Sequence, residues 1–357
     1  MNLFTEDILE QAALSWFESL GYSVIFGPDI AHDGQSPERG NYGEVILEAR
    51  LHDALMRINK KVPSSAIDDA IRRILITESP SLIINNRSFH KMITDGIDVQ
   101  YNRPDGTVKT DKVYLFDFEN PDNNDWAVIN QFTVIENSIN RRPDIIIFLN
   151  GIPLVLFELK SASNEETDIQ KAFHQIETYI KEISSIFIYN SFCVISDGLL
   201  AKAGTMTSNF ERFMSWRTED GDSILSMDEP QLETLIKGIF DKRRFLDIIK
   251  NFILFQDDSG TVTKILAGYH QYHAVNKAID NTDKALGAKI DRRIGIVWHT
   301  QGSGKSLTMV FYAAKAVQAF GNPTIIVLTD RNDLDDQLYG TFAKSEAILR
   351  QTPRQAA

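Results

Sequence analysis

Apolar positions recur along the chain at two periods, which predict helices and strands in mixed order. Spacings of three and four residues predict helices over 5–20, 42–58, 64–76, 167–182, 230–254, 270–280 and 305–319. Shorter apolar runs predict strands at 22–26, 113–118, 126–135, 144–149, 153–160 and 186–195. Strands in the middle of the chain, with helices before and after them, indicate an α/β fold around a central mixed sheet.

The pattern changes after the polar segment 257–260, which we interpret as a domain boundary. A strand at 294–298, a glycine-containing loop, the helix at 305–319 and a strand at 324–328 form a β-loop-α-β unit. We therefore expect one domain over 1–258 and the beginning of a nucleotide-binding motor domain over 259–357. Because the residues after 328 are too few to complete a parallel sheet, the sequence also indicates an N-terminal fragment of a longer protein.

Composition places the chain among ordinary globular proteins, with 43% hydrophobic and 24% charged residues in 357. The longest apolar runs, 145–148 and 154–157, are too short to span a bilayer, so no membrane is expected. The N-terminus lacks the pattern of a secretory signal. The single cysteine, Cys193, lies in an apolar run, which is compatible with a reducing cytoplasm.

The net charge of -12 does not by itself suggest a nucleic-acid binder, since such proteins usually carry a basic face. A contact with DNA would depend on local basic clusters. The candidates are residues 141–142, 242–244 and 292–293, and each can equally be read as an ordinary solvated cluster.

Candidate catalytic groups follow Pro143. Asp144 precedes an apolar run, and Glu158 and Lys160 end the next one. Asn150-Gly151 between the runs predicts a β-hairpin. A two-residue loop with regular pairing would leave Asp144 and Glu158 on opposite faces, because side chains alternate along a strand. We therefore predict a three-residue loop, with a glycine bulge at Gly151, that brings the three side chains together.

Two carboxylates are suitable ligands for Mg²⁺, and a lysine beside them can stabilise developing negative charge. The pattern predicts metal-dependent cleavage of a phosphodiester bond, with Asp144 and Glu158 as metal ligands. The alternative is a surface hairpin with ordinary charges. The apolar runs around these residues argue against it, because unpaired buried charges are costly.

Three further residues are candidates for the same site. Gln175 and Tyr179 are four residues apart on a predicted helix, so they share a face and could contact DNA or hold the carboxylates. Glu44, on the predicted helix 42–58, is a weaker candidate for a further metal ligand. A solvated helix face explains these residues as well.

A second site lies at residues 301–306, Gln-Gly-Ser-Gly-Lys-Ser. A glycine loop between a strand and a helix is the context of a phosphate-binding loop. The backbone of Gly302, Ser303 and Gly304 would surround the phosphates, Lys305 would reach the β- and γ-phosphates, and Ser306 would bind the Mg²⁺ of ATP. His299 stands where the general pattern has its first glycine. Asp330-Arg331 could touch a DNA backbone or cap the next helix.

These motifs resemble the motor and nuclease subunit, the R subunit, of type I restriction endonucleases. The segments 142–161 and 172–179 are similar to that family's nuclease core, of the PD-(D/E)xK superfamily, and to its Q-x-x-x-Y motif. Residues 299–306 resemble its phosphate loop, including His299. Residues 269–272 resemble the upstream glutamine motif, which implies that Gln271 reads adenine, and 329–334 resemble the next motif of superfamily 2 helicases.

The resemblance implies a Mg²⁺-dependent and ATP-dependent type I site-specific deoxyribonuclease. It would translocate and cut double-stranded DNA together with methyltransferase and specificity subunits. Two alternatives stay open: a repair or recombination helicase–nuclease, and a non-enzymatic docking scaffold.

Overall fold

The computed structural model describes residues 5–161, 165–287, 291–330, 332–350 and 352–354. The chain divides into two compact units, Met1–Leu246 and Asp247–Ala357. Each unit is described by itself below.

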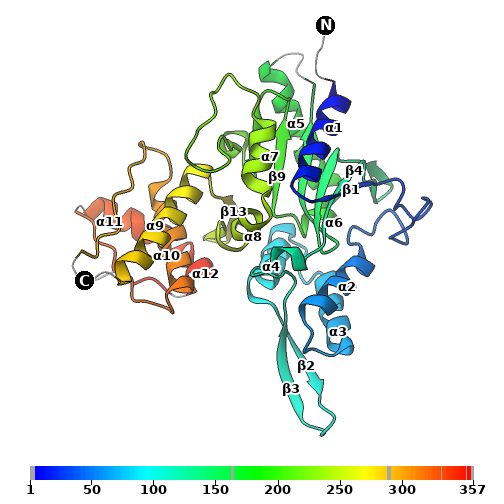
Figure 1. Ribbon diagram of the computed structural model, residues 1–357, viewed down its shortest axis with the longest axis horizontal. Helices are drawn as coiled ribbons and strands as arrows, with labels where there is room; N and C mark the ends of the chain where they lie inside the picture. Colours follow the sequence, from blue (N-terminus) through cyan, green and yellow to red (C-terminus); the bar gives the residue numbers. More distant parts are fainter. Residues whose placement is uncertain (1–4, 162–164, 288–290, 331, 351, 355–357) are drawn as a thin grey trace. The chain divides into compact units, whose positions relative to one another are not determined.

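The first unit is built around one seven-stranded mixed sheet (Figure 1). Two strand pairs, β1–β4 and β8–β9, are parallel, and the other pairs are antiparallel. This confirms the predicted mixed α/β architecture. In spatial order the strands are β1 (Ser23–Phe26), β4 (Trp126–Asn130), β7 (Ile145–Leu149), β8 (Ile152–Leu159), β9 (Phe192–Ser196), β10 (Ala201–Gly204) and β11 (Met214–Ser215).

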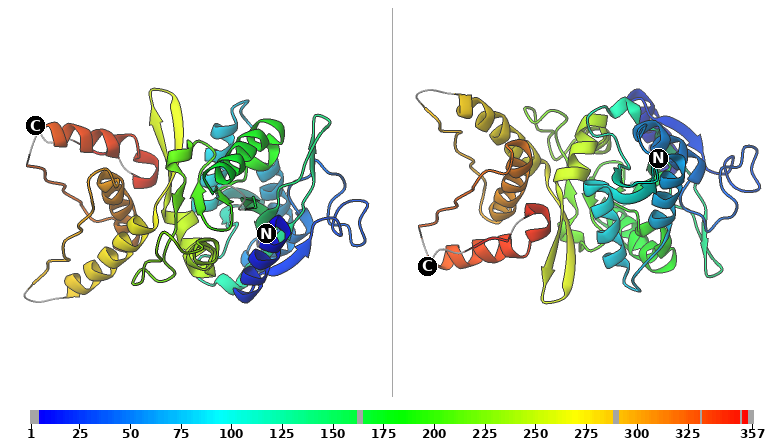
Figure 2. Two further views of the ribbon diagram at one scale, coloured as in Figure 1. Left: turned by 90° about the horizontal axis from the view of Figure 1, so that it is seen from above. Right: turned by 90° about the horizontal axis from the view of Figure 1, so that it is seen from below.

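Helices cover both faces of this sheet. Phe157 of β8 packs against Phe17 of α1 (Glu6–Ser19) and Phe240 of α7 (Leu232–Phe240), so these helices lie on one face. The next residue, Glu158, points to the other face and meets Tyr179 of α5 (Glu165–Glu182). In the view from above, α1 and α5 lie on opposite sides of the strands (Figure 2). Beside α7 follows α8 (Lys242–Asn251).

The remaining elements of the first unit surround the sheet. A two-stranded ribbon of β2 and β3 projects from the helices beside it (Figure 1). A second ribbon of β5 and β6 stands between β4 and β7 in sequence. The bounds are α2 (Glu48–Ile58), α3 (Ser64–Leu75), α4 (Leu82–Asp95), β2 (Ile97–Asn102), β3 (Val108–Val113), β5 (Val134–Glu136), β6 (Ile139–Arg141), α6 (Ser184–Phe187), and the 3₁₀ turns η1 (Pro121–Asn123) and η2 (Phe210–Arg212).

Several predicted elements have different bounds in the structure. The strand expected over 126–135 is divided into β4 and β5, and the helix expected over 270–280 continues to Gly287. The helix expected over 42–58 begins only at Glu48, and the strand expected at 113–118 ends at Val113. The strand expected over 186–195 is partly the helix α6, and the helix expected over 230–254 is two helices followed by a strand. Short buried apolar runs explain these errors, because their composition alone does not distinguish a strand from a helix or a packed loop.

The predicted three-residue hairpin loop is wrong, because β7 and β8 are joined by the two residues Asn150 and Gly151. Leu149 pairs with Ile152, but Ile145 pairs with Phe157. A bulge in β8 provides the change of register, since Phe148 pairs with Pro153 while Ile147 pairs with Val155. The extra residue reverses the alternation of faces beyond it. Pro153 has no N–H to donate, which favours an irregularity at this position.

The second unit begins within α8, and the boundary expected at 258/259 falls inside this unit. The polar residues 257–260 form the turn between β12 (Ile253–Asp258) and β13 (Thr261–Leu266). Asp258 and Thr261 are paired there, so the segment is a hairpin end rather than a linker. The helices of this unit are α9 (Tyr269–Gly287), α10 (Lys305–Ala319), α11 (Asn332–Ala343) and α12 (Glu346–Leu349).

The strands expected at 294–298 and 324–328 are not strands in the structure, although the helix expected at 305–319 is confirmed. Trp298 is 89% exposed and Leu328 is 88% exposed. Parallel strands are stable when they are paired and covered on both faces. The segments lack those partners among the described residues.

Within the described part of the chain, no helix has both the length and the apolar character needed to cross a membrane.

Candidate active site and phosphate-binding loop

The bulge in β8 brings Asp144 next to Glu158. Asp144 lies directly before β7, and its carboxylate Oδ2 accepts a hydrogen bond of 2.7 Å from the backbone N–H of Leu159. Its own carbonyl oxygen accepts a bond of 3.0 Å from the N–H of Gln131. Glu158 is only 2% exposed. The two carboxyl groups therefore lie at the rim of the sheet, and a backbone hydrogen bond holds that of Asp144.

Lys160 completes this cluster. Its ammonium Nζ lies 2.6 Å from Glu158 Oε1 and donates a second bond of 3.0 Å to the carbonyl oxygen of Leu159. Burial alone would lower the pKa of Lys160, but the charges of Glu158 and Asp144 together raise it above its ordinary value. Lys160 is therefore a cation at neutral pH.

Tyr179 on α5 contacts the carboxylate of Glu158 from the helix that covers this face of the sheet. Its hydroxyl donates a hydrogen bond of 3.1 Å to Glu158 Oε2. Gln175, one turn earlier, is hydrogen-bonded to Tyr179, so the two residues share a face as their spacing predicted. Glu158 thus has one oxygen held by a lysine and the other by a tyrosine.

Both carboxyl groups have raised pKa values. Burial raises the pKa of Asp144 to about 6, against the opposing effects of the Leu159 N–H and Lys160. Burial and then the charge of Asp144 raise the pKa of Glu158 to about 7. Two carboxylates share a poorly hydrated site, which disfavours their charged forms.

Sequence reasoning missed an additional carboxylate here. Glu10 on α1 is 7% exposed, and its oxygens accept hydrogen bonds from the amides of Asn130 (2.7 Å) and Gln131 (2.6 Å). Its charge helps to raise the pKa of Asp144. Glu10 stands with Ala13, Leu14 and Phe17 on the buried stripe of α1, and an acid inside an apolar stripe is the signal that could have revealed it.

The donor set fits a hard divalent cation. No group of three His, Cys, Asp or Glu side chains in the described residues could hold a metal. Mg²⁺ does not need such a cage, since it commonly uses one or two carboxylates and takes its other oxygens from water and substrate. A cation beside Asp144 and Glu158 would favour the charged forms that burial opposes.

Glu44, in contrast, is not on a helix. It lies in a turn, where its carboxylate accepts bonds from the N–H of Gly40 (2.6 Å) and the amide of Asn41 (2.7 Å). Both oxygens therefore close its own loop. The structure gives Glu44 no contact with Asp144 or Glu158. The prediction that Glu44 lies on a helix is therefore corrected, because that helix begins only at Glu48.

In the second unit, the loop before α10 is the candidate phosphate-binding loop, and two of its glycines have positive φ. Gly302 and Gly304 have φ values of +82° and +79°, and Gly304 is the N-cap of α10. Lys305 Nζ donates to the carbonyl oxygens of His299 (2.9 Å) and Thr300 (2.8 Å). Ser306 lies in the first turn of α10, where the N–H groups have no partner within the helix.

Gln271 lies beside this loop. Its carboxamide accepts from the N–H of Gly268 (2.9 Å) and donates to the carbonyl oxygen of Gly304 (3.1 Å). His270 also bonds the loop, through Nε2 and the carbonyl oxygen of Ser303 at 3.0 Å. The structure therefore brings Gln271 to the loop, where its side chain binds backbone groups. Arg331, suggested as a DNA contact, lies outside the described residues.

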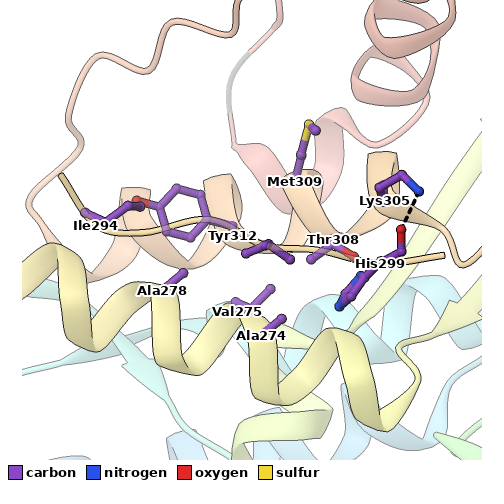
Figure 3. Close-up of a pocket in the computed structure, with 10 residues that line it drawn as sticks. Ala274, Val275, Ala278, Ile294, His299, Lys305, Thr308, Met309 and Tyr312 are labelled. Carbon is purple, nitrogen blue, oxygen red and sulfur yellow. Dashed lines mark hydrogen bonds between the residues drawn. The ribbon is translucent and has the colours of Figure 1, made fainter.

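A cavity of about 160 Å³ lies between α9, α10 and the segment that precedes the loop (Figure 3). Lys305 and His299 stand at one end of it. Most of its wall is aliphatic, so the groups suited to phosphate lie in the loop. The lining residues are Ala274, Val275, Ala278, Ile294, Val297, His299, Lys305, Thr308, Met309 and Tyr312.

The fold and these two candidate sites define a class of protein: a mixed α/β unit that groups two carboxyl groups, followed by a unit with a glycine loop at the start of a helix. Comparisons with known proteins agree. A family model described as "Type I restriction enzyme R protein N terminus" matches residues 3–212. Another, described as "SWI2/SNF2 ATPase", matches residues 270–357.

Individual relatives are similar over nearly the whole chain. The type I restriction enzyme HindI endonuclease subunit of Haemophilus influenzae is 40% identical over 99% of this chain and 34% of its own length. A putative type I restriction enzyme endonuclease subunit of Methanocaldococcus jannaschii is 34% identical over 94% of this chain and 34% of its own. The chain belongs to the type I restriction enzyme R protein family, and it spans about a third of the length of these relatives.

Proposed function

We propose that the first unit is a PD-(D/E)xK-type nuclease that cuts phosphodiester bonds of double-stranded DNA with Mg²⁺, and that the second begins an ATP-driven motor of superfamily 2. The observation that carries the proposal is the convergence of Asp144, Glu158 and Lys160 at one rim of the sheet, produced by a bulge. A surface hairpin with ordinary charges would not bury two carboxyl groups at this cost.

Asp144 and Glu158 would hold the metal ion. When bound, Mg²⁺ polarises a phosphoryl oxygen and lowers the pKa of a bound water. The Leu159 N–H fixes one oxygen of Asp144, and Tyr179 fixes one oxygen of Glu158. These bonds restrict the carboxylates to one geometry, which reduces the entropy lost when the site is filled.

Lys160 would act as a cation rather than as a general base, because its pKa is raised. A fixed ammonium at this position can stabilise the charge that develops on the phosphate oxygens. Its bond to the Leu159 carbonyl oxygen aims the side chain along the rim of β8. Gln175 would position Tyr179 by a hydrogen bond, and Tyr179 in turn bonds Glu158.

The loop at 299–306 would bind ATP. The backbone of Gly302, Ser303 and Gly304 would enclose the phosphates, with Lys305 and Ser306 at the β- and γ-phosphates and their Mg²⁺. Gln271 would connect adenine to the loop, since its carboxamide already bonds the Gly304 carbonyl oxygen. In the complete subunit, ATP hydrolysis would drive translocation along DNA before cutting.

The partners would be methyltransferase and specificity subunits, which supply sequence recognition. The relatives' names, which describe endonuclease subunits of type I restriction enzymes, support this assembly. The site of action would be the cytoplasm, where the host's DNA is methylated and incoming DNA is not.

The test is cleavage of unmethylated circular DNA by the full-length subunit with its partner subunits, Mg²⁺ and ATP. We expect Glu158→Ala to abolish cutting, by at least about a hundredfold, while ATP hydrolysis continues. Lys305→Ala should abolish both. The matched control is Glu177→Ala, which removes a half-exposed carboxylate of α5 that lies 2.8 Å from His174 Nδ1, and it should leave both activities unchanged.

Other results would assign a different function. Normal cutting by Lys305→Ala would make the nuclease independent of ATP and favour a repair nuclease. Normal cutting by Glu158→Ala would exclude the β7–β8 hairpin as the nuclease site and favour a docking role for the first unit.

A further inference from the structure

Lys202 on β10 lies on the same face of the sheet as Glu158, two strands away. Glu158 pairs with Ile195 of β9, and Ile195 pairs with Lys202. Directly paired residues on neighbouring strands point to the same face. With strands about 4.8 Å apart, the backbone of Lys202 stands about 10 Å from that of Glu158.

The surroundings of Lys202 hold its side chain in place. Its ammonium lies 4.5 Å from the ring centroid of Phe210. That ring packs on Phe173 of α5, at 5.6 Å between centroids, and Phe173 also contacts Phe213. The helix that supplies Tyr179 to the active site therefore also fixes the aromatic platform under Lys202.

This lysine lacks an anionic partner in direct contact. Within the described residues, no carboxylate oxygen lies within 4.0 Å of its ammonium, and no hydrogen bond joins it to another group. Burial lowers the pKa of Lys202, opposed by the more distant charge of Asp197. A partly buried cation in this state gains most from an anion that arrives from outside, because its hydration is already reduced.

We propose that Lys202 binds a backbone phosphate of the DNA strand that is cut, within about three phosphates of the scissile bond. The distance of about 10 Å along the rim corresponds to about three phosphates, since one strand carries a phosphate every 3.4 Å of axis. Phosphate contacts of this kind set the register of a duplex on a protein. The inference rests on the proposed nuclease function and adds a substrate-binding residue to it.

The experiment measures binding of the 357-residue chain to a fluorescent duplex of about 30 base pairs over a range of NaCl concentrations, with Ca²⁺ to prevent cutting. Lys202→Met keeps the aliphatic stem over Phe210 and removes the charge. We expect affinity to fall about tenfold, as for loss of a hydrogen bond to a charged group. The slope of log affinity against log salt should decrease by about 0.9, the value for one phosphate contact.

Three controls make the result specific. Lys202→Arg should restore both affinity and slope. Lys91→Met removes an exposed charge from α4, which packs at the opposite end of β9, and should change neither quantity. Asp144→Asn should stop cutting in the assembled enzyme but leave the salt dependence of DNA binding unchanged. Cutting by this variant would contradict the nuclease proposal without bearing on the role of Lys202.

An unchanged slope and affinity for Lys202→Met would overturn the inference while leaving the nuclease site intact. So would absence of duplex binding by the unaltered chain. A loss that Lys202→Arg does not restore, together with a lower melting temperature, would identify Lys202 as a purely structural cover for Phe210.

Discussion

At the scale of single residues, the paired carboxyl groups of Asp144 and Glu158 oppose folding at neutral pH. Their pKa values of about 6 and about 7 lie above those of exposed carboxyl groups. Burial therefore outweighs the attraction of Lys160. A folded state that binds protons more tightly than the unfolded state loses stability as pH rises. The site is thus built at a cost in stability, as is common for active sites.

We predict that Glu158→Gln stabilises the chain by about 1 kcal/mol at pH 8. The neutral amide removes the buried charge but keeps the shape. For a carboxyl group with a raised pKa, stability is complete below the pKa of the unfolded chain and is lost as pH rises through about 7. The advantage of Glu158→Gln should therefore disappear near pH 5. Urea denaturation at several pH values measures it.

Added Mg²⁺ provides the second readout of this variant. A ligand that binds only the folded state stabilises it. The unaltered chain should gain stability with Mg²⁺ at pH 8, and Glu158→Gln should gain much less. Stability curves that run parallel from pH 5 to pH 8, with equal effects of Mg²⁺, would contradict the assignment of Glu158 as a metal ligand.

At the scale of elements, the hairpin of β7 and β8 determines whether a site exists. Its turn is fixed by Asn150 and Gly151, with φ values of +51° and +76°. Asn150 is fully buried, and its side chain bonds the backbone of Asp125 and Leu115. The bulge next to Pro153 then aligns the two carboxyl groups. Turn and bulge act together, because a change of register in either one moves Glu158 to the opposite face.

We predict that Gly151→Ala destabilises the first unit by at least about 2 kcal/mol. A Cβ atom at this position would lie 2.4 Å from the carbonyl oxygen of Leu47, which is backbone and cannot move aside cheaply. The matched control is Gly106→Ala, at a similar φ of +82° but with open space around it. That variant should lose only about 1 kcal/mol, the cost of the left-handed conformation.

Thermal or urea denaturation of the two variants measures the difference. Equal losses at Gly151 and Gly106 would show that contact with Leu47 contributes nothing beyond backbone strain.

At the scale of the whole molecule, the chain spans about a third of the length of its relatives. The first unit contains a seven-stranded sheet whose central strands β4, β7, β8 and β9 are buried. In the second unit, the segments 294–298 and 324–328 carry large apolar side chains that are exposed, including Ile296 (92%) and Ile326 (78%). Apolar side chains on both faces of a segment are typical of strands inside a parallel sheet.

We predict that Trp298 is open to solvent in the 357-residue chain. Acrylamide should quench its fluorescence strongly, whereas Trp126, which is 4% exposed, should be protected. Trp298→Phe should remove most of the readily quenched signal, and Trp126→Phe should remove only protected signal. A protected Trp298 would show that these segments pair with other residues of the chain.

The sequence by itself determined the helices with a clear apolar stripe and the candidate residues of both sites. The helices α1, α3 and α10 begin and end within a residue or two of the prediction, because local spacing decides which face of a helix is apolar. The grouping of Asp144, Glu158 and Lys160 was also predicted, since burial of unpaired charges is costly and they had to meet.

Only the tertiary structure decided how these side chains meet. The turn predicted from the sequence was wrong, and a bulge between β7 and β8 provides the register, because backbone pairing depends on partners distant in the chain. The same limit concealed Glu10, which α1 brings near Asp144 at the rim of the sheet, and Lys202, which lies on the Glu158 face of β10. The strands expected at 294–298 and 324–328 show the converse: a strand-like sequence forms a strand only where a neighbouring strand supplies its hydrogen bonds.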